Sequence, residues 1–150
     1  MTGQVIDASV TLPSFFPDEA DRFTEAVLDS IVATETWAPL LWCLECGNAI
    51  LVASRRGRIG IERRVEIAAQ LGLLPVNVDR EPVAIGVLDA LADRHGLTVY
   101  DAAYLELAIR RSLPLVTLDA RLAAAARAAR HPVRTRAAAA RATRPRSARR

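Results

Sequence analysis

Apolar residues recur along this chain at two kinds of interval, one helical and one extended. In residues 18–33 they fall at helical spacing, as Phe23, Val27 and Ile31 illustrate, and so share one face. The same criterion predicts helices over residues 18–33, 40–56, 61–71, 80–95, 100–108 and 120–130. Strands are predicted at residues 5–6, 37–39, 74–78 and 113–118. Strands alternating with helices indicate an α/β domain with a mostly parallel sheet.

Glycine residues punctuate this pattern at the expected element ends. Gly57 and Gly60 mark a turn, and Gly72 and Gly96 are expected to end the third and fourth helices. The run at residues 113–118 is largely apolar, which is typical of a strand covered on both faces. The pattern therefore predicts a layered domain whose last strand lies in the interior.

Length and composition narrow the class of protein. A chain of 150 residues suits one domain with a sizeable core. No apolar run approaches the roughly 20 residues that span a bilayer, and the N-terminus lacks the basic and apolar regions of a signal peptide. Two cysteines without a secretory signal favour the reducing cytoplasm and no disulfide framework. We therefore expect a cytoplasmic protein with no membrane contact.

Charge is distributed unevenly between the two ends of the chain. Residues 1–119 carry all 17 acids and 10 arginines, a net −7, whereas residues 120–150 carry 10 arginines and no acid, a net +10. We expect a folded domain over residues 1–131 and a partly disordered Arg/Ala-rich tail over residues 132–150. The basic end suggests a polyanionic partner, although the absence of lysine is equally consistent with the codon bias of a GC-rich genome.

Four carboxylates occupy positions at which side chains of an α/β sheet meet. Asp7 and Asp119 each follow a predicted strand, and functional groups of open α/β sheets gather at the carboxyl ends of strands. Asp101 begins the helix before the last strand, where a plain helix cap is the alternative role. Glu45 lies on an apolar helix, with Asn48 three residues on and on the same face as a supporting group.

Convergence of these acids would require a cation. At about 5 Å and an effective dielectric constant of about 20, each pair of like charges costs about 3 kcal/mol. Carboxylate oxygens suit Mg²⁺ or Mn²⁺ and not Zn²⁺, and such a metal makes water a usable nucleophile toward a phosphodiester. The Cys43-x-x-Cys46 spacing has no second ligand pair for zinc, so we interpret these cysteines as small buried residues of the Glu45 helix.

Four motifs then resemble a known family when taken together and in order. They are Val5-Ile6-Asp7-Ala8-Ser9-Val10, Leu44-Glu45 with Asn48 following, Tyr100-Asp101-Ala102-Ala103-Tyr104, and Thr117-Leu118-Asp119-Ala120-Arg121-Leu122. Over about residues 4–131 the chain resembles the PIN-domain ribonucleases, and within them the VapC toxins of bacterial toxin–antitoxin pairs. The resemblance implies a three-layer α/β/α fold, Mg²⁺-dependent endonucleolytic cleavage of RNA, homodimerisation, and inhibition by a small VapB-type antitoxin.

The resemblance also implies roles for individual residues. It carries the family's acidic quartet onto Asp7, Glu45, Asp101 and Asp119. Asp7 and Asp101 are expected to ligate the metal directly, while the other two bind through water or complete a second metal position. Ser9 and Thr117 match small hydroxyl positions and are expected to orient the carboxylates or water.

Two other functions fit parts of the sequence. A non-catalytic RNA-binding module would use the arginine-rich tail and would bind RNA without forming a product. A phosphotransfer domain would use Asp7 as its acceptor, but the second Asp usual after such a nucleophile is replaced by Ala8 and Ser9. The toxin ribonuclease is the function that the four motifs favour.

Overall fold

The computed structural model describes residues 3–142, which form a single twisted sheet covered by helices. Within these residues all strand pairings are parallel, and the strands lie in the order β3-β2-β1-β4-β5. The strands are β1 (Gly3–Ile6), β2 (Glu35–Pro39), β3 (Val76–Asp79), β4 (Leu115–Val116) and β5 (Val133–Arg134). The predicted α/β/α fold with a parallel sheet is confirmed.

Helices alternate with the strands, and α1, η1 and α8 are present in addition to the helices that the sequence predicts. They are α1 (Ala8–Thr11), the 3₁₀ helix η1 (Leu12–Phe15), α2 (Arg22–Ala33), α3 (Leu41–Arg55), α4 (Ile61–Leu73), α5 (Ile85–His95), α6 (Val99–Arg111), α7 (Ala120–Ala128) and α8 (Arg136–Ala142). In the described part of the chain, no helix combines the length and apolar character needed to cross a membrane.

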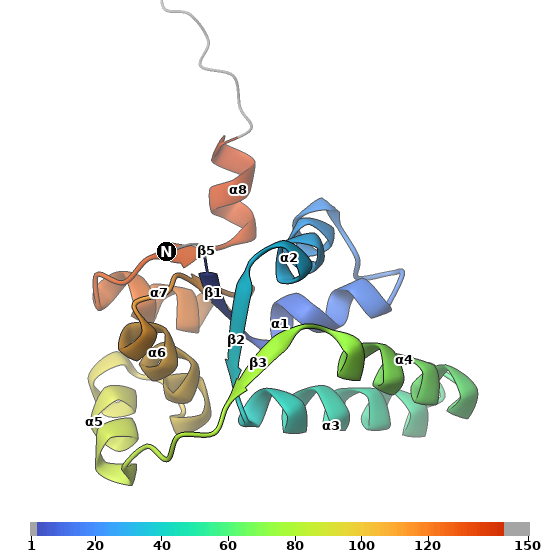
Figure 1. Ribbon diagram of the computed structural model, residues 1–150, viewed down its shortest axis with the longest axis horizontal. Helices are drawn as coiled ribbons and strands as arrows, with labels where there is room; N and C mark the ends of the chain where they lie inside the picture. Colours follow the sequence, from blue (N-terminus) through green and yellow to red (C-terminus); the bar gives the residue numbers. More distant parts are fainter. Residues whose placement is uncertain (1–2, 143–150) are drawn as a thin grey trace, which may run out of the picture.

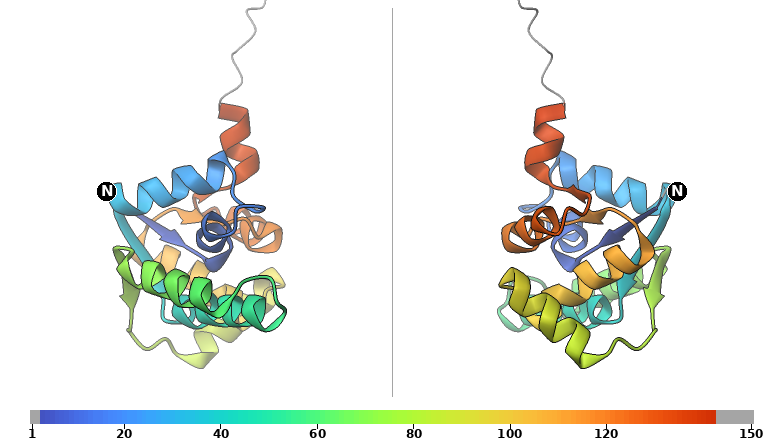
Figure 2. Two further views of the ribbon diagram at one scale, coloured as in Figure 1. Left: turned by 90° about the vertical axis from the view of Figure 1, so that its right-hand side faces the viewer. Right: turned by 90° about the vertical axis from the view of Figure 1, so that its left-hand side faces the viewer.

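The strand order reverses between β1 and β4. The chain steps from β1 to β2 to β3 in one direction and then crosses back to β4 and β5 on the other side of β1. Right-handed crossovers consequently place α2, α3 and α4 on one face of the sheet and α5 and α6 on the other. Figures 1 and 2 show β1 and β2 between these two layers. The carboxyl ends of β1 and β4 thus flank a topological switch point, where open α/β sheets bind their ligands.

β1 and β4 are buried on both faces, as expected for short apolar strands inside a parallel sheet. Val5 and Ile6 of β1 and both residues of β4 have no exposed surface, so each strand is covered on both faces. α6 packs against β1, β2 and β4 and buries Leu105 and Ala108 completely. The helix that carries Asp101 therefore lies against the centre of the sheet.

Proline residues shift the ends of two helices from their predicted positions. α5 begins at Ile85 and not near residue 80, because Pro82 disfavours helical conformation in the residue before it. α4 continues through Gly72 to Leu73, so the prediction that Gly72 ends it is wrong. Leu74 adopts an extended conformation ahead of Pro75, which accounts for the end of the helix. Gly96 does end α5, with a left-handed φ of 63°.

The sheet continues beyond residue 131, where we expected the tail to begin. Val133 and Arg134 pair with Leu115 and Val116 and so cover the edge of β4. α8 follows directly, and residues 143–150 of the expected tail lie outside the described residues. β4 is shorter than the predicted run because Pro114 has no N–H to donate and the chain turns toward α7 after Val116.

Candidate active site

Asp7 is a buried carboxylate at the carboxyl end of β1. Its side chain lies beside the switch point, and the residue is only 5% exposed. The Ser9 hydroxyl donates to Asp7 Oδ1 at 2.6 Å, and the Thr117 hydroxyl donates to Asp7 Oδ2 at 2.7 Å. Thr117 comes directly after β4, so the ends of the two central strands meet at this carboxylate.

The two hydroxyl groups are themselves held by the turn between β4 and α7. The Leu118 N–H donates to Ser9 Oγ and the Asp119 N–H donates to Thr117 Oγ1, both at 2.9 Å. A hydroxyl has one proton to donate, and each of these oxygens already accepts a backbone hydrogen bond. The backbone amides therefore leave both hydroxyl protons directed at Asp7.

Burial makes ionisation of Asp7 costly. It raises the pKa of this carboxyl from 3.8 to about 6, against the opposing effect of the hydrogen bonds from Ser9 and Thr117. The negative charges of Asp119 and Glu45 raise the pKa further. A cation at this point would remove the penalty that burial and like charge impose on the ionised form.

Glu45 reaches the same region from α3. It is half-buried, and the hydroxyl of Tyr104 on α6 donates to its Oε2. Burial raises the pKa of Glu45, and the charge of Asp101 adds to this effect. The pKa of Tyr104 is raised by burial and by Glu45, so its hydroxyl remains protonated and donates.

Asp101 lies in the first turn of α6 but is not its cap. Thr98 is the N-cap, and its Oγ1 accepts the Asp101 N–H at 3.0 Å. The Thr98 hydroxyl in turn donates to Asp101 Oδ2 at 2.8 Å. The plain-cap alternative considered for Asp101 is therefore wrong, because a neighbouring threonine performs that task and also holds the carboxylate.

Asp119 does cap a helix, since its Oδ1 accepts the Leu122 N–H at the start of α7 at 2.8 Å. Each of the four acids thus has at least one oxygen held by a donor of its own. Three of the acids also have an oxygen that accepts no hydrogen bond from residues 3–142 and is available to a ligand. These atoms are Oε1 of Glu45, Oδ1 of Asp101 and Oδ2 of Asp119.

The acids are electrostatically coupled but do not form a compact metal cage. Asp7 feels the charges of Asp119 and Glu45, and Glu45 feels that of Asp101. Nevertheless, no three His, Cys, Asp or Glu side chains in the described residues lie close enough to hold a metal ion together. Mg²⁺ binds through one or two carboxylates and keeps several waters, so an open, all-oxygen arrangement with a costly buried charge fits this ion.

Asn48 and the two cysteines make none of the hydrogen bonds that hold the four acids. Asn48 is exposed on α3, three residues after Glu45, and makes no hydrogen bond with the described residues, so its supporting role stays a prediction. Cys46 is buried, and burial raises the pKa of its thiol to about 12, which makes it unreactive. Cys43 is exposed, contrary to the expectation that both cysteines are buried.

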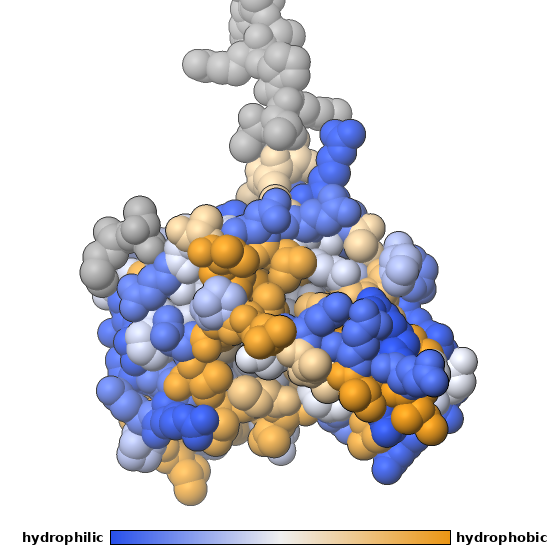
Figure 3. Space-filling view, turned by 45° about the vertical axis from the view of Figure 1, so that its right-hand side comes forward, coloured by the Kyte–Doolittle hydropathy of each residue, from blue (hydrophilic) through white to orange (hydrophobic). Residues whose placement is uncertain are grey.

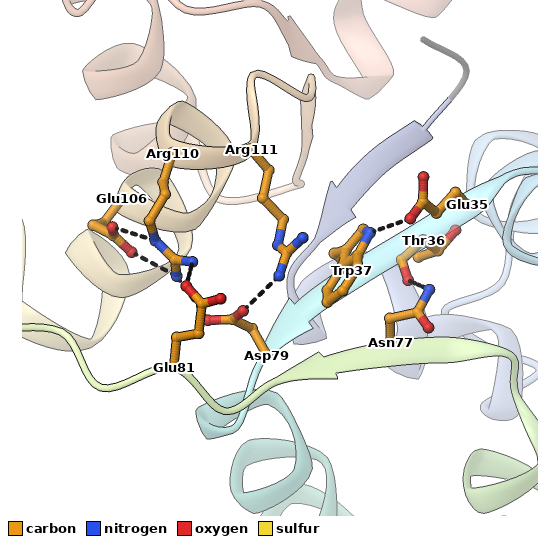
Figure 4. Close-up of polar contacts among 9 residues, drawn as sticks. All are labelled: Glu35, Thr36, Trp37, Asn77, Asp79, Glu81, Glu106, Arg110 and Arg111. Carbon is orange, nitrogen blue, oxygen red and sulfur yellow. Dashed lines mark hydrogen bonds and ion pairs between the residues drawn. The ribbon is translucent and has the colours of Figure 1, made fainter.

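Asp79 is a second buried acid at a strand end, and its surroundings are opposite in charge. Arg110 and Arg111, at the end of α6, donate to its two oxygens at 2.7 Å and 2.8 Å (Figure 4). Burial alone would raise the pKa of Asp79, but these two arginines lower it below 3.8. The Arg111 guanidinium also lies 3.2 Å from the centre of the Trp37 ring. Asp79 is therefore part of a structural brace between β3 and α6.

Sequence reasoning missed two donors of the site, Tyr104 and Thr98. Tyr104 lies three residues after Asp101, on a face of α6 that is otherwise apolar, and a buried hydroxyl there needs a partner. Thr98 with Asp101 three residues later has the spacing of a helix capping box. Both signals were present in the sequence.

The strand order and the hydroxyl-held aspartate define a parallel α/β domain with an acidic site at its switch point. Comparison with known families then places it: the chain belongs to the PIN domain family, whose model matches residues 5–128. Ribonuclease VapC3 of Pyrobaculum aerophilum is 31% identical over 121 residues, covering 79% of this chain and 91% of that protein.

Two solved structures share the fold. PAE2754 from Pyrobaculum aerophilum has a TM-score of 0.61 and 23% identity, covering 83% of this chain and 84% of that one. VapBC2 from Rickettsia felis, solved bound to a DNA fragment from its promoter, has a TM-score of 0.58 and 10% identity, covering 89% and 98%. At these identities the two structures support the fold alone.

Proposed function

We propose that this protein is the toxin of a type II toxin–antitoxin pair and acts in the cytoplasm as a Mg²⁺-dependent endoribonuclease. The observation that carries the proposal is Asp7, a buried acid held by two hydroxyls and surrounded by the charges of Asp119 and Glu45. Membership of the PIN domain family and the likeness to a protein named Ribonuclease VapC3 support it.

The acids have different tasks in this proposal. Asp7 and Asp101 would hold Mg²⁺ or Mn²⁺ directly, and Glu45 and Asp119 would bind through water or complete a second metal position. The metal would neutralise charge on the phosphodiester and make water a better nucleophile. Ser9 and Thr117 hold Asp7 in one rotamer, and each of its two oxygens would keep a lone pair for the metal.

Glu45 is suited to handling the proton released by the attacking water. Its pKa is raised by burial and by Asp101, and a carboxylate of raised pKa is a stronger base. Its Oε1 accepts no hydrogen bond from the described residues, whereas Oε2 is held by Tyr104. The free oxygen is consequently the one that would receive the proton.

A homodimer and a small VapB-type antitoxin belong to the same proposal. Ile61, Val65 and Leu73 leave apolar surface exposed along α4. Figure 3, which brings the side of α3 and α4 forward, shows hydrophobic areas there among hydrophilic ones. An exposed apolar helix face is typical of a protein contact.

An RNA cleavage assay tests the catalytic part of the proposal. Wild type is expected to cut RNA with Mg²⁺ or Mn²⁺ and to stop when EDTA is added. Asp7→Asn and Asp101→Asn should abolish cleavage, while Asp89→Asn, which changes an exposed acid on α5, should leave it unchanged. Cleavage that survives both of the first two substitutions would show that these acids do not hold the metal.

The partner is tested in cells, and the alternative function in a binding assay. Expression should arrest growth, and a small protein encoded beside this chain should relieve the arrest. Light scattering should give twice the mass of one chain. RNA binding that is strongly salt-dependent and yields no product would favour instead the RNA-binding module that uses the arginine-rich end.

A further inference from the structure

Tyr104, like Thr98, is a donor of the acidic site that lies outside the residues assigned to catalysis. It is 2% exposed, on the face of α6 that carries Asp101 one turn earlier. Its hydroxyl crosses from α6 to α3 and donates to Glu45 Oε2. The contact therefore joins the two helices that supply two of the four acids.

Glu45 needs such a tether more than the other acids do. Its side chain has one more rotatable bond than that of an aspartate and is only half-buried, so packing removes less of its rotamer freedom. The charge of Asp101 also disfavours the ionised carboxylate at its present position. Asp7, by contrast, is held by two hydroxyls, and Asp119 is held by a backbone amide.

We propose that Tyr104 is a positioning residue, whose hydroxyl holds the Glu45 carboxylate beside Asp101 and leaves Oε1 available to a metal or its water. The proposal rests on the function proposed above and adds to it a residue that does not touch metal or RNA. Because the ring fills the core and the hydroxyl makes the contact, Tyr104→Phe separates the two roles.

The test combines metal binding with kinetics in the full chain. Groups that orient metal ligands typically change metal affinity or activity by about 10- to 100-fold when removed. Tyr104→Phe should therefore weaken Mn²⁺ binding, measured by electron paramagnetic resonance, and lower kcat by about that factor. KM for RNA and the melting temperature in EDTA should change little. Tyr100→Phe, on the same helix but 66% exposed, is the matched control and should match wild type.

A double-mutant cycle shows whether Tyr104 acts through Glu45. Tyr104→Phe should have no further effect on Mn²⁺ affinity or kcat in a Glu45→Gln background, because the group that it positions is already changed. Should Tyr104→Phe fail to fold, Glu45→Asp makes the same test by withdrawing the carboxylate from the hydroxyl while keeping its charge.

The outcomes distinguish this inference from the proposed function. Wild-type Mn²⁺ affinity and kcat in Tyr104→Phe or in Glu45→Asp would overturn the positioning role while wild type still cuts RNA. Additive losses in the double mutant would overturn action through Glu45. Failure of wild type itself to bind Mn²⁺ or to cut RNA would overturn the proposed function, and the inference with it.

Discussion

Replacing Asp7 by asparagine should make the protein more stable as it removes the proposed activity. Asparagine has nearly the same shape but no charge, and the folded protein disfavours the charge of Asp7. Its pKa rises from 3.8 to about 6 on folding, chiefly because of burial. A carboxyl whose pKa is raised on folding destabilises the native state wherever it is ionised.

The magnitude follows from the pKa. Each pKa unit corresponds to about 1.4 kcal/mol, so ionised Asp7 costs the folded state about 3 kcal/mol at about pH 8. Asparagine offers an NH₂ group where Asp7 accepts a hydrogen bond, so Ser9 or Thr117 must turn to accept from it. Allowing about 1 kcal/mol for that rearrangement, we expect a net gain of about 2 kcal/mol. In a domain of this size that corresponds to a rise of about 4–8 °C in melting temperature.

The sign of the pH dependence is the sharper test. Below pH 3.8 the carboxyl is neutral in both states, and its penalty grows as pH rises through about 6. The gain from Asp7→Asn should therefore be full at about pH 8 and nearly absent at about pH 4. Urea denaturation followed by circular dichroism, in EDTA, measures it. Saturating Mg²⁺ should then stabilise wild type but not the variant.

Asp79→Asn is the matched control, because Asp79 is also a buried acid at a strand end. Arg110 and Arg111 lower its pKa below 3.8, so its charge stabilises the fold. Asp79→Asn should cost about 2 kcal/mol or more between about pH 5 and 8, with little change across that range. An Asp7→Asn variant that is less stable than wild type at about pH 8, or whose gain does not vary with pH, would refute the assignment of Asp7 as a costly buried charge.

Four further substitutions and a truncation test other contacts. Thr98→Ala should lower stability by about 1 kcal/mol in urea denaturation through loss of the α6 cap, whereas Asp101→Asn should leave stability nearly unchanged and abolish RNA cleavage. Gly96→Ala should destabilise the protein by about 1 kcal/mol or more, because residue 96 has a left-handed φ of 63°. Gly72→Ala should instead stabilise the protein by about 0.5–1 kcal/mol, because residue 72 lies inside α4 with open space around it. A chain ending at residue 131 loses the Arg134 carbonyl that accepts the Thr117 N–H at 3.1 Å, so it should unfold at lower urea and cut RNA poorly.

Periodicity predicted most of the fold because most of the longer elements have a clear local signal. The helical spacing of apolar residues and the buried runs at β1 and β4 are properties of short segments. In a parallel sheet, strand ends lie at one edge, so the positions of Asp7 and Asp119 could also be predicted. Both acids follow buried strands and lie at the switch point of the observed sheet.

Contacts between distant segments could not be predicted in the same way. Thr117 and Asp7 lie 110 residues apart in sequence, and Tyr104 and Glu45 lie 59 apart. Which hydroxyl holds which carboxylate depends on the twist of the sheet and on side-chain rotamers. β5 is likewise hidden, because Val133–Arg134 is short and lies in an Arg/Ala-rich region. It forms because the edge of β4 offers unpaired backbone groups.

Asp7 and Asp79 show why a strand-end acid cannot be assigned a role from its local sequence. Each ends an apolar strand and each is buried, yet the pKa of one is raised and that of the other is lowered. The difference lies in strand order. β3 is an edge strand, and the end of α6 brings Arg110 and Arg111 against it.

Asp7, at the switch point, has different neighbours from Asp79. The connections from β1 and β4 run to opposite sides of the sheet. The side chains that interact with Asp7 are hydroxyls and acids, and no basic group in the described chain is among them. A buried carboxylate without an internal cation has unsatisfied charge, and a bound metal is the natural source of the missing positive charge. The topology thus separates a structural acid from a candidate catalytic one within a single sheet. The changes in stability expected for Asp7→Asn and Asp79→Asn have opposite signs, and measuring them tests this difference directly.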